Sequence, residues 1–185
     1  PSAWHVICIV LSFQMECAMT SFPLENKLSD TDARYLRDAI RMSIVAKERG
    51  NRPFGAVVIS KDGQLLAEAY GNTTESGDCT GHAELTAVRI VSPNHTRSVL
   101  AQATLYSSAE PCVMCAGAIF WSGIQRLVFG IDAERLRLFR GELLEQKDAA
   151  LSCRDVFSAS SHSIECIGPS LIEEASRVHE GFWQT

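Results

Sequence analysis

Two short segments constrain this chain more than any other feature: residues 82–84 (His-Ala-Glu) and residues 111–115 (Pro-Cys-Val-Met-Cys). Together they offer one imidazole, two thiols and a carboxylate. Imidazole nitrogen and thiolate sulfur are the ligands of zinc, whereas magnesium and calcium are bound by oxygen. We therefore expect a fold that brings the two segments together, so that His82, Cys112 and Cys115 bind one zinc ion.

The number of ligands bears on the kind of zinc site. Three protein ligands leave one position of a tetrahedral zinc open for water, as in hydrolytic sites, whereas four ligands make a structural site. Zinc lowers the pKa of its water to about 7. Glu84 lies two residues after His82, where we expect it to carry protons as the general acid and base. Attack of this water on an amidine-like carbon, followed by loss of ammonia, is hydrolytic deamination.

Other interpretations of the same residues have less support. Cys112 and Cys115 alone also fit a redox pair or half of a four-cysteine zinc site. The sequence holds no second Cys-x-x-Cys pair, and the segment around His82 has no place in a redox motif. A lone glutamate on a helix is ordinarily a solvated charge, but the position of Glu84 beside a ligand histidine favours a catalytic role.

Local signals predict a mixed α/β fold. Ser29 with Asp32 resembles a capping box, and Gly50 ends the helix that follows. Asp62-Gly63 is typical of a hairpin turn. The expected helices cover residues 30–48, 82–91 and 112–122, a broken helix lies within 132–150, and an apolar stripe at Leu171, Ala175, Val178 and Phe182 marks a last helix. The expected strands cover residues 56–60, 65–70, 104–107, 126–130 and 163–167.

Both metal-binding segments fall where helices are expected to begin. A helix N-terminus carries unpaired N–H groups and about half a positive charge. That field lowers the pKa of a nearby cysteine and favours the thiolate that binds metal. Since Cys112 and Cys115 are three residues apart, their side chains share one helix face.

Composition sets outer limits on the function. A chain of 185 residues with 46% hydrophobic residues suits one compact domain. The net charge of −5 argues against tight non-specific nucleic-acid binding, and no stretch approaches the ~20 apolar residues that span a bilayer. Seven cysteines without framework spacing favour a reducing compartment, and we expect a cytoplasmic protein.

The first residues differ from the rest of the chain. The segment 4–13 is apolar, but it has neither the basic start nor the cleavage site of a signal peptide. Met19 begins a stretch that reads like a natural start. We therefore expect residues 1–18 to be a non-native or disordered extension, and residues 19–185 to form a single domain with a C-terminal helical tail.

Two longer strings resemble a known family. Residues 81–89 (GHAELTAVR) and 107–130 (SSAEPCVMCAGAIFWSGIQRLVFG) are similar to the two signatures of the cytidine/deoxycytidylate deaminase superfamily. The string EPCVMCAGAI most resembles the purine-type branch, which holds tRNA adenosine deaminases and guanine deaminases. The similarity runs from about Arg34 to Ile131. It implies a three-layer α-β-α sandwich with a mixed five-stranded sheet, one zinc ion per subunit, and a homodimer.

The resemblance also implies substrate-binding residues. It assigns an amide hydrogen bond with the substrate to Asn72, contact with the ring to the backbone near Ala83, and aromatic walls to Phe54 and Trp121. A tail that closes over the base corresponds to Phe182 and Trp183. The alternatives are a turn residue for Asn72 and ordinary packing for the four aromatic residues.

The sequence thus predicts a zinc-dependent hydrolytic deaminase of a small nucleobase or nucleoside, with a guanine-like purine first. A tRNA adenosine deaminase is one rival, but it needs a basic surface, and Arg135, Arg137 and Arg140 are the only dense basic group. A cytosine-type deaminase is a second rival. A non-catalytic zinc-binding module is a third.

Overall fold

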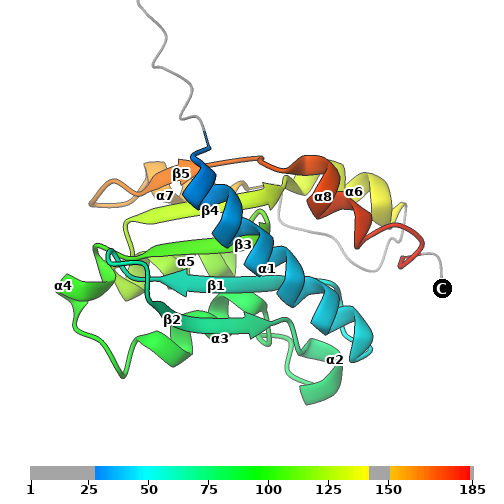
Figure 1. Ribbon diagram of the computed structural model, residues 1–185, viewed down its shortest axis with the longest axis horizontal. Coiled ribbons are helices and arrows are strands. Elements are labelled where there is room, and N and C mark those ends of the chain that lie inside the picture. Colours follow the sequence, from blue (N-terminus) through cyan, green and yellow to red (C-terminus); the bar gives the residue numbers. More distant parts are fainter. Residues whose placement is uncertain (1–27, 142–150, 184–185) are drawn as a thin grey trace, which may run out of the picture.

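The computed structural model describes residues 28–141 and 151–183. The predictions for residues 1–18 and for residues 142–150 lie outside these ranges. Within them the chain forms one mixed sheet of five strands (Figure 1). The order across the sheet is β2 (Leu65–Tyr70), β1 (Gly55–Ile59), β3 (Thr104–Ala109), β4 (Arg126–Ile131) and β5 (Glu165–Ile167). Strand β1 is antiparallel to both of its neighbours, whereas β3, β4 and β5 are parallel.

Helices cover both faces of the sheet. On one face lie α1 (Asp30–Glu48) and α8 (Ile172–Arg177), and on the other lie α3 (Ala83–Val91), α5 (Val113–Ser122) and α7 (Cys153–Ser158). Figure 1 shows α1 crossing in front of the strands and α3 and α5 behind them. The predicted three-layer sandwich with a mixed five-stranded sheet is confirmed.

Strand β1 shows how the sequence builds two cores. It is buried along its whole length, and its side chains alternate between faces. Val57 and Ile59 pack against the α1 side, whereas Ala56 and Val58 pack against the α3 side. At its first residue, Gly55, a Cβ atom would lie 2.3 Å from the carbonyl oxygen of Ala39. Glycine is therefore required for α1 to pass this close to the sheet.

The predicted elements are present, and their ends differ by only a few residues. The capping box of Ser29 and Asp32 begins α1 as expected. Three short helices were not predicted: α2 (Thr73–Ser76), α4 (Arg97–Leu100) and α7. Helices this short carry too little periodicity to be detected in a sequence.

The region after β4 agrees with the expectation at one point and differs from it at another. Helix α6 (Ala133–Arg140) ends where Gly141 adopts a positive φ of 63°, in agreement with the predicted break. The last helix, α8, ends at Arg177 although the apolar stripe runs to Phe182. Beyond it the chain makes tight turns, in which the backbone amides of His179, Glu180 and Phe182 each donate to the carbonyl three residues earlier. Val178 and His179 are buried there.

No helix among the described residues is long and apolar enough to span a bilayer.

Candidate metal centre and active site

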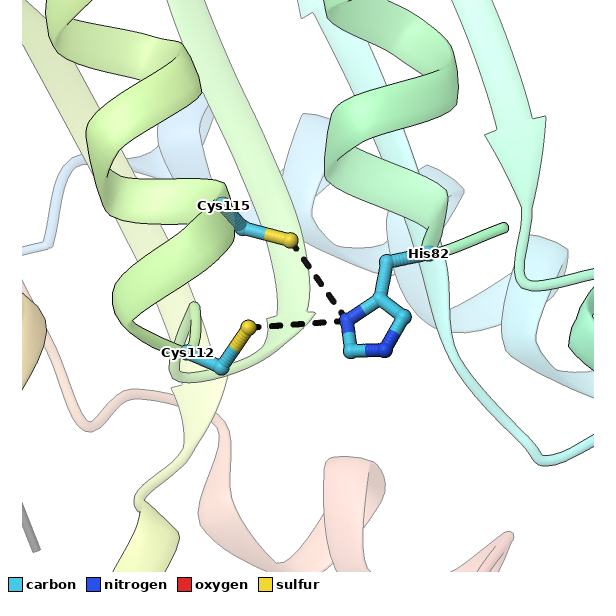
Figure 2. A group of neighbouring side chains, drawn as sticks. All are labelled: His82, Cys112 and Cys115. Atoms are coloured by element: carbon cyan, nitrogen blue, oxygen red, sulfur yellow. Dashed lines mark hydrogen bonds between the residues drawn. The ribbon is translucent and has the colours of Figure 1, made fainter. Parts of the chain in front are cut away.

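The three expected metal ligands lie at the starts of two neighbouring helices. His82 is the N-cap of α3 and Cys112 is the N-cap of α5, both with extended backbone. Cys115 lies one turn further along α5 and is fully buried. Because α3 and α5 pack side by side, the three side chains converge (Figure 2). The predicted helix starts are thus confirmed.

The distances among the ligand atoms match a tetrahedral metal site. The Nδ1 atom of His82 lies 3.6 Å from the Cys112 sulfur and 3.5 Å from the Cys115 sulfur. Bond lengths of about 2.05 Å for Zn–N and 2.3 Å for Zn–S, at a tetrahedral angle, place such a nitrogen and sulfur about 3.6 Å apart. All three ligand atoms lie within 4.8 Å of one another. The residues therefore fit zinc, with the imidazole binding through Nδ1.

The two thiols differ in their readiness to ionise. Hydrogen bonds from the Cys115 thiol and from the His82 ring outweigh burial and lower the pKa of Cys112 to about 4. The same contact with Cys112, together with burial, raises the pKa of Cys115. The pair thus holds one thiolate before metal binding, and the metal displaces the second proton when it binds.

A carboxylate lies beside this cluster. Glu84, in the first turn of α3, is only 5% exposed. The Ser107 hydroxyl on β3 donates a hydrogen bond of 2.8 Å to its Oε1 atom. Burial raises the pKa of Glu84. A buried carboxyl group with a raised pKa both accepts and releases a proton more readily near neutral pH than an exposed one.

One pocket contains these groups. It has a volume of about 370 Å³, and both His82 and Glu84 line it together with Cys112. This volume lies at the low end of the range for small-molecule sites. The wall is formed by four parts of the chain: the segment before β1, the stretch between β2 and α3, the turn between β3 and α5, and helix α6 with Leu151.

Three of the predicted substrate-binding residues lie in or beside the pocket. Phe54 lines it directly. Asn72 lies between the lining residues Gly71 and Thr73. Its backbone N–H group donates a hydrogen bond to the carbonyl of Gly81, next to His82. Ala83 is fully buried between the ligand histidine and Glu84. Their contact with a substrate stays a prediction.

The other three aromatic residues do not line the pocket of this chain. Trp121 is 75% exposed at the end of α5, because the last turn of that helix points it away from the sheet. Trp183 lies behind the wall, with its ring centroid 6.2 Å from that of Phe54, and Phe182 packs edge-on against Trp183. The described part of the tail approaches the pocket through Phe54 and Arg140, whose guanidinium lies 5.0 Å from the Trp183 ring.

The sequence did not indicate three charged residues of the pocket wall: Arg52, Glu110 and Arg140. Two of them had a local signal that was not used. Arg52 opens the loop before β1, and Glu110 lies two residues before the ligand Cys112. Arg140 had none, since only the packing of α6 against the site brings it to the pocket.

Three metal-ligating side chains among the described residues, which would leave a fourth position of a zinc ion for water, and the buried acid beside them are the features of a zinc-dependent hydrolytic enzyme. Residues 29–131 match the family model of the cytidine and deoxycytidylate deaminase zinc-binding region. The chain therefore belongs to the cytidine and deoxycytidylate deaminase family, as the sequence motifs predicted, and zinc is its cofactor.

Individual relatives agree with the family. A probable cytosine deaminase of Schizosaccharomyces pombe is 42% identical over 157 residues, which cover 85% of this chain and 95% of the relative. A tRNA-specific adenosine deaminase of Haemophilus influenzae is 32% identical over 159 residues, which cover 84% and 85%. The predicted enzyme class, a hydrolytic deaminase, is confirmed by these findings.

A solved structure supports the fold. The guanine deaminase from Nitrosomonas europaea superposes with a TM-score of 0.68, over 84% of this chain and 87% of that chain, at 20% identity. At this identity the likeness concerns the fold alone.

Proposed function

We propose that this deaminase acts on a free aminated nucleobase or nucleoside, with a guanine-like purine as the first candidate. The observation that carries the proposal is Glu84, which is buried in the same small pocket as the metal ligands. The pocket volume of about 370 Å³ suits a small heterocycle, and in our proposal the substrate binds with its amino-bearing carbon toward the metal ligands and its ring nitrogen toward the Glu84 carboxyl group.

Zinc, when bound by His82, Cys112 and Cys115, supplies the Lewis acid that makes water nucleophilic at neutral pH. In our proposal Glu84 takes a proton from the attacking water and passes it to a ring nitrogen of the substrate. Glu84 then takes the remaining proton from the hydroxyl group added to the substrate carbon and passes it to the departing amine, so that a C=O bond forms as the C–N bond breaks and ammonia leaves. The Ser107 hydroxyl keeps the carboxylate pointed into the pocket during both transfers.

The electrostatics of the chain favour a small substrate over tRNA. A tRNA ligand requires clustered Lys and Arg to contact phosphates, whereas this chain carries a net charge of −5. Because the chain is 32% identical to the tRNA-specific adenosine deaminase of Haemophilus influenzae, tRNA is included among the substrates to be tested.

Cytosine is a second candidate substrate. The Schizosaccharomyces pombe relative, named a probable cytosine deaminase, matches nearly its whole length to this chain. A cytosine ring also carries an amino group on an amidine-like carbon next to a ring nitrogen, so the same chemistry applies.

An ammonia-release assay on the zinc-loaded protein tests the proposal. The panel holds guanine, adenine and cytosine, their nucleosides, and a tRNA anticodon stem-loop with adenosine at the wobble position. We expect turnover of a free base or nucleoside. Turnover of the stem-loop alone, or no turnover of any compound, would contradict the proposal.

We further propose a homodimer in the cytoplasm, as the family resemblance implies. A large apolar side chain in solvent supports a partner contact at Trp121, which is 75% exposed. Sedimentation of the wild type and of Trp121→Ser tests this. A monomeric wild type would exclude the dimer.

A further inference from the structure

Glu110 connects the metal-binding turn with two helices that are distant in sequence. It follows β3 and lies two residues before Cys112. Its Oε2 atom accepts a hydrogen bond of 3.0 Å from the amide of Ala133, and its Oε1 atom accepts one of 3.3 Å from the amide of Cys153. These amides belong to the first residues of α6 and α7.

Each helix already has a cap of its own. The side chain of Asp132 accepts the Arg135 amide at the start of α6, and the Ser152 hydroxyl accepts the Asp155 amide at the start of α7. Those caps bond the third amide of each helix, whereas Glu110 supplies an acceptor for the first amide of each helix. Because the first amides of a helix have no partner within it, one carboxylate satisfies two donors that the local caps leave open.

Residues in or next to these two helices form one side of the pocket. Leu136 and Arg140 of α6 line the pocket, as does Leu151, two residues before α7. Glu110 itself lines the pocket between these residues and Cys112. The backbone amide of Glu110 donates to Ile131 at 2.8 Å, which fixes the turn to the end of β4.

We propose that Glu110 is a positioning residue for the substrate: it holds the pocket wall formed by α6 and the start of α7 at a set distance from the metal-binding turn. This inference rests on the proposed function and adds a determinant of substrate binding to it. Only a carboxylate has two acceptor oxygens without a donor. Both oxygens accept backbone amides, so Glu110 acts through the wall and not as a second proton carrier.

The test compares Glu110→Gln with two control variants, Asp132→Ala and Ser152→Ala. Glutamine keeps one acceptor oxygen and turns an N–H group toward the other amide, so one helix is released from the turn. Each control removes a cap from one of the same helices without touching the metal-binding turn. We expect Glu110→Gln to keep its zinc and its kcat within about twofold, and to raise KM roughly tenfold, since small misplacements of binding groups have effects of this size.

The controls separate positioning from stability. We expect both to lower the melting temperature as Glu110→Gln does, yet to leave KM unchanged. If all three variants show the same KM, or if Glu110→Gln loses its zinc, the proposal is wrong. Glu110→Asp keeps the charge but is one methylene shorter, so it cannot reach both amides. A wild-type KM in this variant would show that charge alone matters and would overturn the proposal.

A second measurement does not need a substrate. Hydrogen exchange at the amides of Ala133 and Cys153 in the zinc-loaded protein reports the two hydrogen bonds directly. We expect faster exchange at one or both amides in Glu110→Gln, and unchanged exchange would contradict the proposal. If the wild type deaminates no compound of the panel, the proposed function fails, whereas the exchange data still judge the role of Glu110.

Discussion

The hydroxyl of Ser107 donates a hydrogen bond of 2.8 Å to Oε1 of Glu84, and both residues are buried. Ser107 comes from β3 and Glu84 from α3, so the sheet and a helix of the adjacent layer jointly fix the direction of one carboxylate. A buried carboxylate held in this way needs no reorganisation when it transfers a proton. The pair therefore ties the fold directly to the proposed chemistry.

We predict that Ser107→Ala slows turnover and leaves zinc bound. Loss of the partner of a buried acceptor costs about 1–3 kcal/mol, which, if it falls on the transition state, corresponds to a decrease in kcat of roughly 5-fold to 150-fold. Steady-state kinetics with metal analysis measure both effects. Ser108→Ala is the matched control, because that buried hydroxyl accepts the amide of Gly55 and does not contact Glu84. Equal losses of kcat in both variants would assign Ser107 to stability alone.

Glu84→Gln removes the proposed proton carrier without changing the size of the side chain. We expect the variant to bind zinc and to fold, and kcat to fall by about 10²–10⁴-fold, the usual contribution of a general acid or base. Glu134→Gln, an exposed residue in the first turn of α6, serves as the control and should keep full activity. Turnover near the wild-type rate in Glu84→Gln would remove this residue from the mechanism.

The metal cluster makes a prediction about cysteine variants. Cys112→Ala leaves one thiol and one imidazole, so we expect zinc to be lost on dialysis against a chelator and thermal stability to fall with it. Cys79→Ala provides the control: Cys79 lies close to His82 in sequence but is exposed and does not line the pocket. Elemental analysis of both proteins checks the prediction. Full zinc retention in Cys112→Ala would show that Cys112 is not a ligand.

The metal site could be predicted from the sequence because its signals are local. Helix starts at His82 and Cys112 follow from short motifs, and three-residue spacing places Cys112 and Cys115 on one helix face. The strands could also be predicted from the sequence, because β-branched residues and turn signals lie next to one another along the chain.

The pocket wall could not be predicted in this way. Arg140 reaches the site only because α6 is held against the metal-binding turn, a contact between distant segments. The exposure of Trp121 was equally hidden, because an aromatic residue at a helix end gives the same sequence pattern whether packed or solvated. His179 belongs to no motif in the sequence, and the structure buries it among aromatic rings, with 1% exposure.

The prediction that Phe182 and Trp183 belong to a tail that closes over the substrate is better tested by a point variant than by deletion of residues 179–185. Such a deletion also removes the buried His179, so any loss of activity would mix with loss of stability. Trp183→Ala removes contacts with Phe54 and Arg140, both of which line the pocket. Aromatic and cation–π contacts are each worth about 0.5–1.5 kcal/mol, so we expect KM to rise roughly threefold to tenfold with zinc content unchanged.

Trp121→Ala is the companion variant for the tail. Its side chain lies outside the pocket of its own chain, so we expect KM to stay near the wild-type value. A larger effect of Trp121→Ala than of Trp183→Ala would reverse the placement of the two residues and would indicate that a second subunit brings Trp121 to the site.

The last prediction concerns stability at the opposite end of the sheet. Asp32 at the start of α1 accepts two hydrogen bonds from Arg126, of 2.7 and 3.0 Å, and one of 2.8 Å from the Tyr106 hydroxyl. Burial alone would raise the pKa of Asp32, but the hydrogen bonds, those of Arg126 above all, hold it well below its usual range. A carboxyl group with a depressed pKa stabilises the fold fully above its unfolded pKa of about 3.9, and this stabilisation is lost progressively as the pH falls from there toward the lower pKa of the folded state.

We therefore expect Asp32→Asn to lower the free energy of unfolding by about 3 kcal/mol at pH 7, the lower end of the cost of breaking a buried ion pair. Below about pH 4 the wild type loses this advantage, and each pH unit narrows the difference by about 1.4 kcal/mol. Urea unfolding of both proteins at pH 7 and pH 3 measures it. Asp38→Asn, an exposed residue of the same helix that pairs loosely with Arg41, should change stability by less than about 1 kcal/mol at either pH. A difference between wild type and Asp32→Asn that is equal at pH 7 and pH 3 would show that the carboxylate charge does not stabilise the fold.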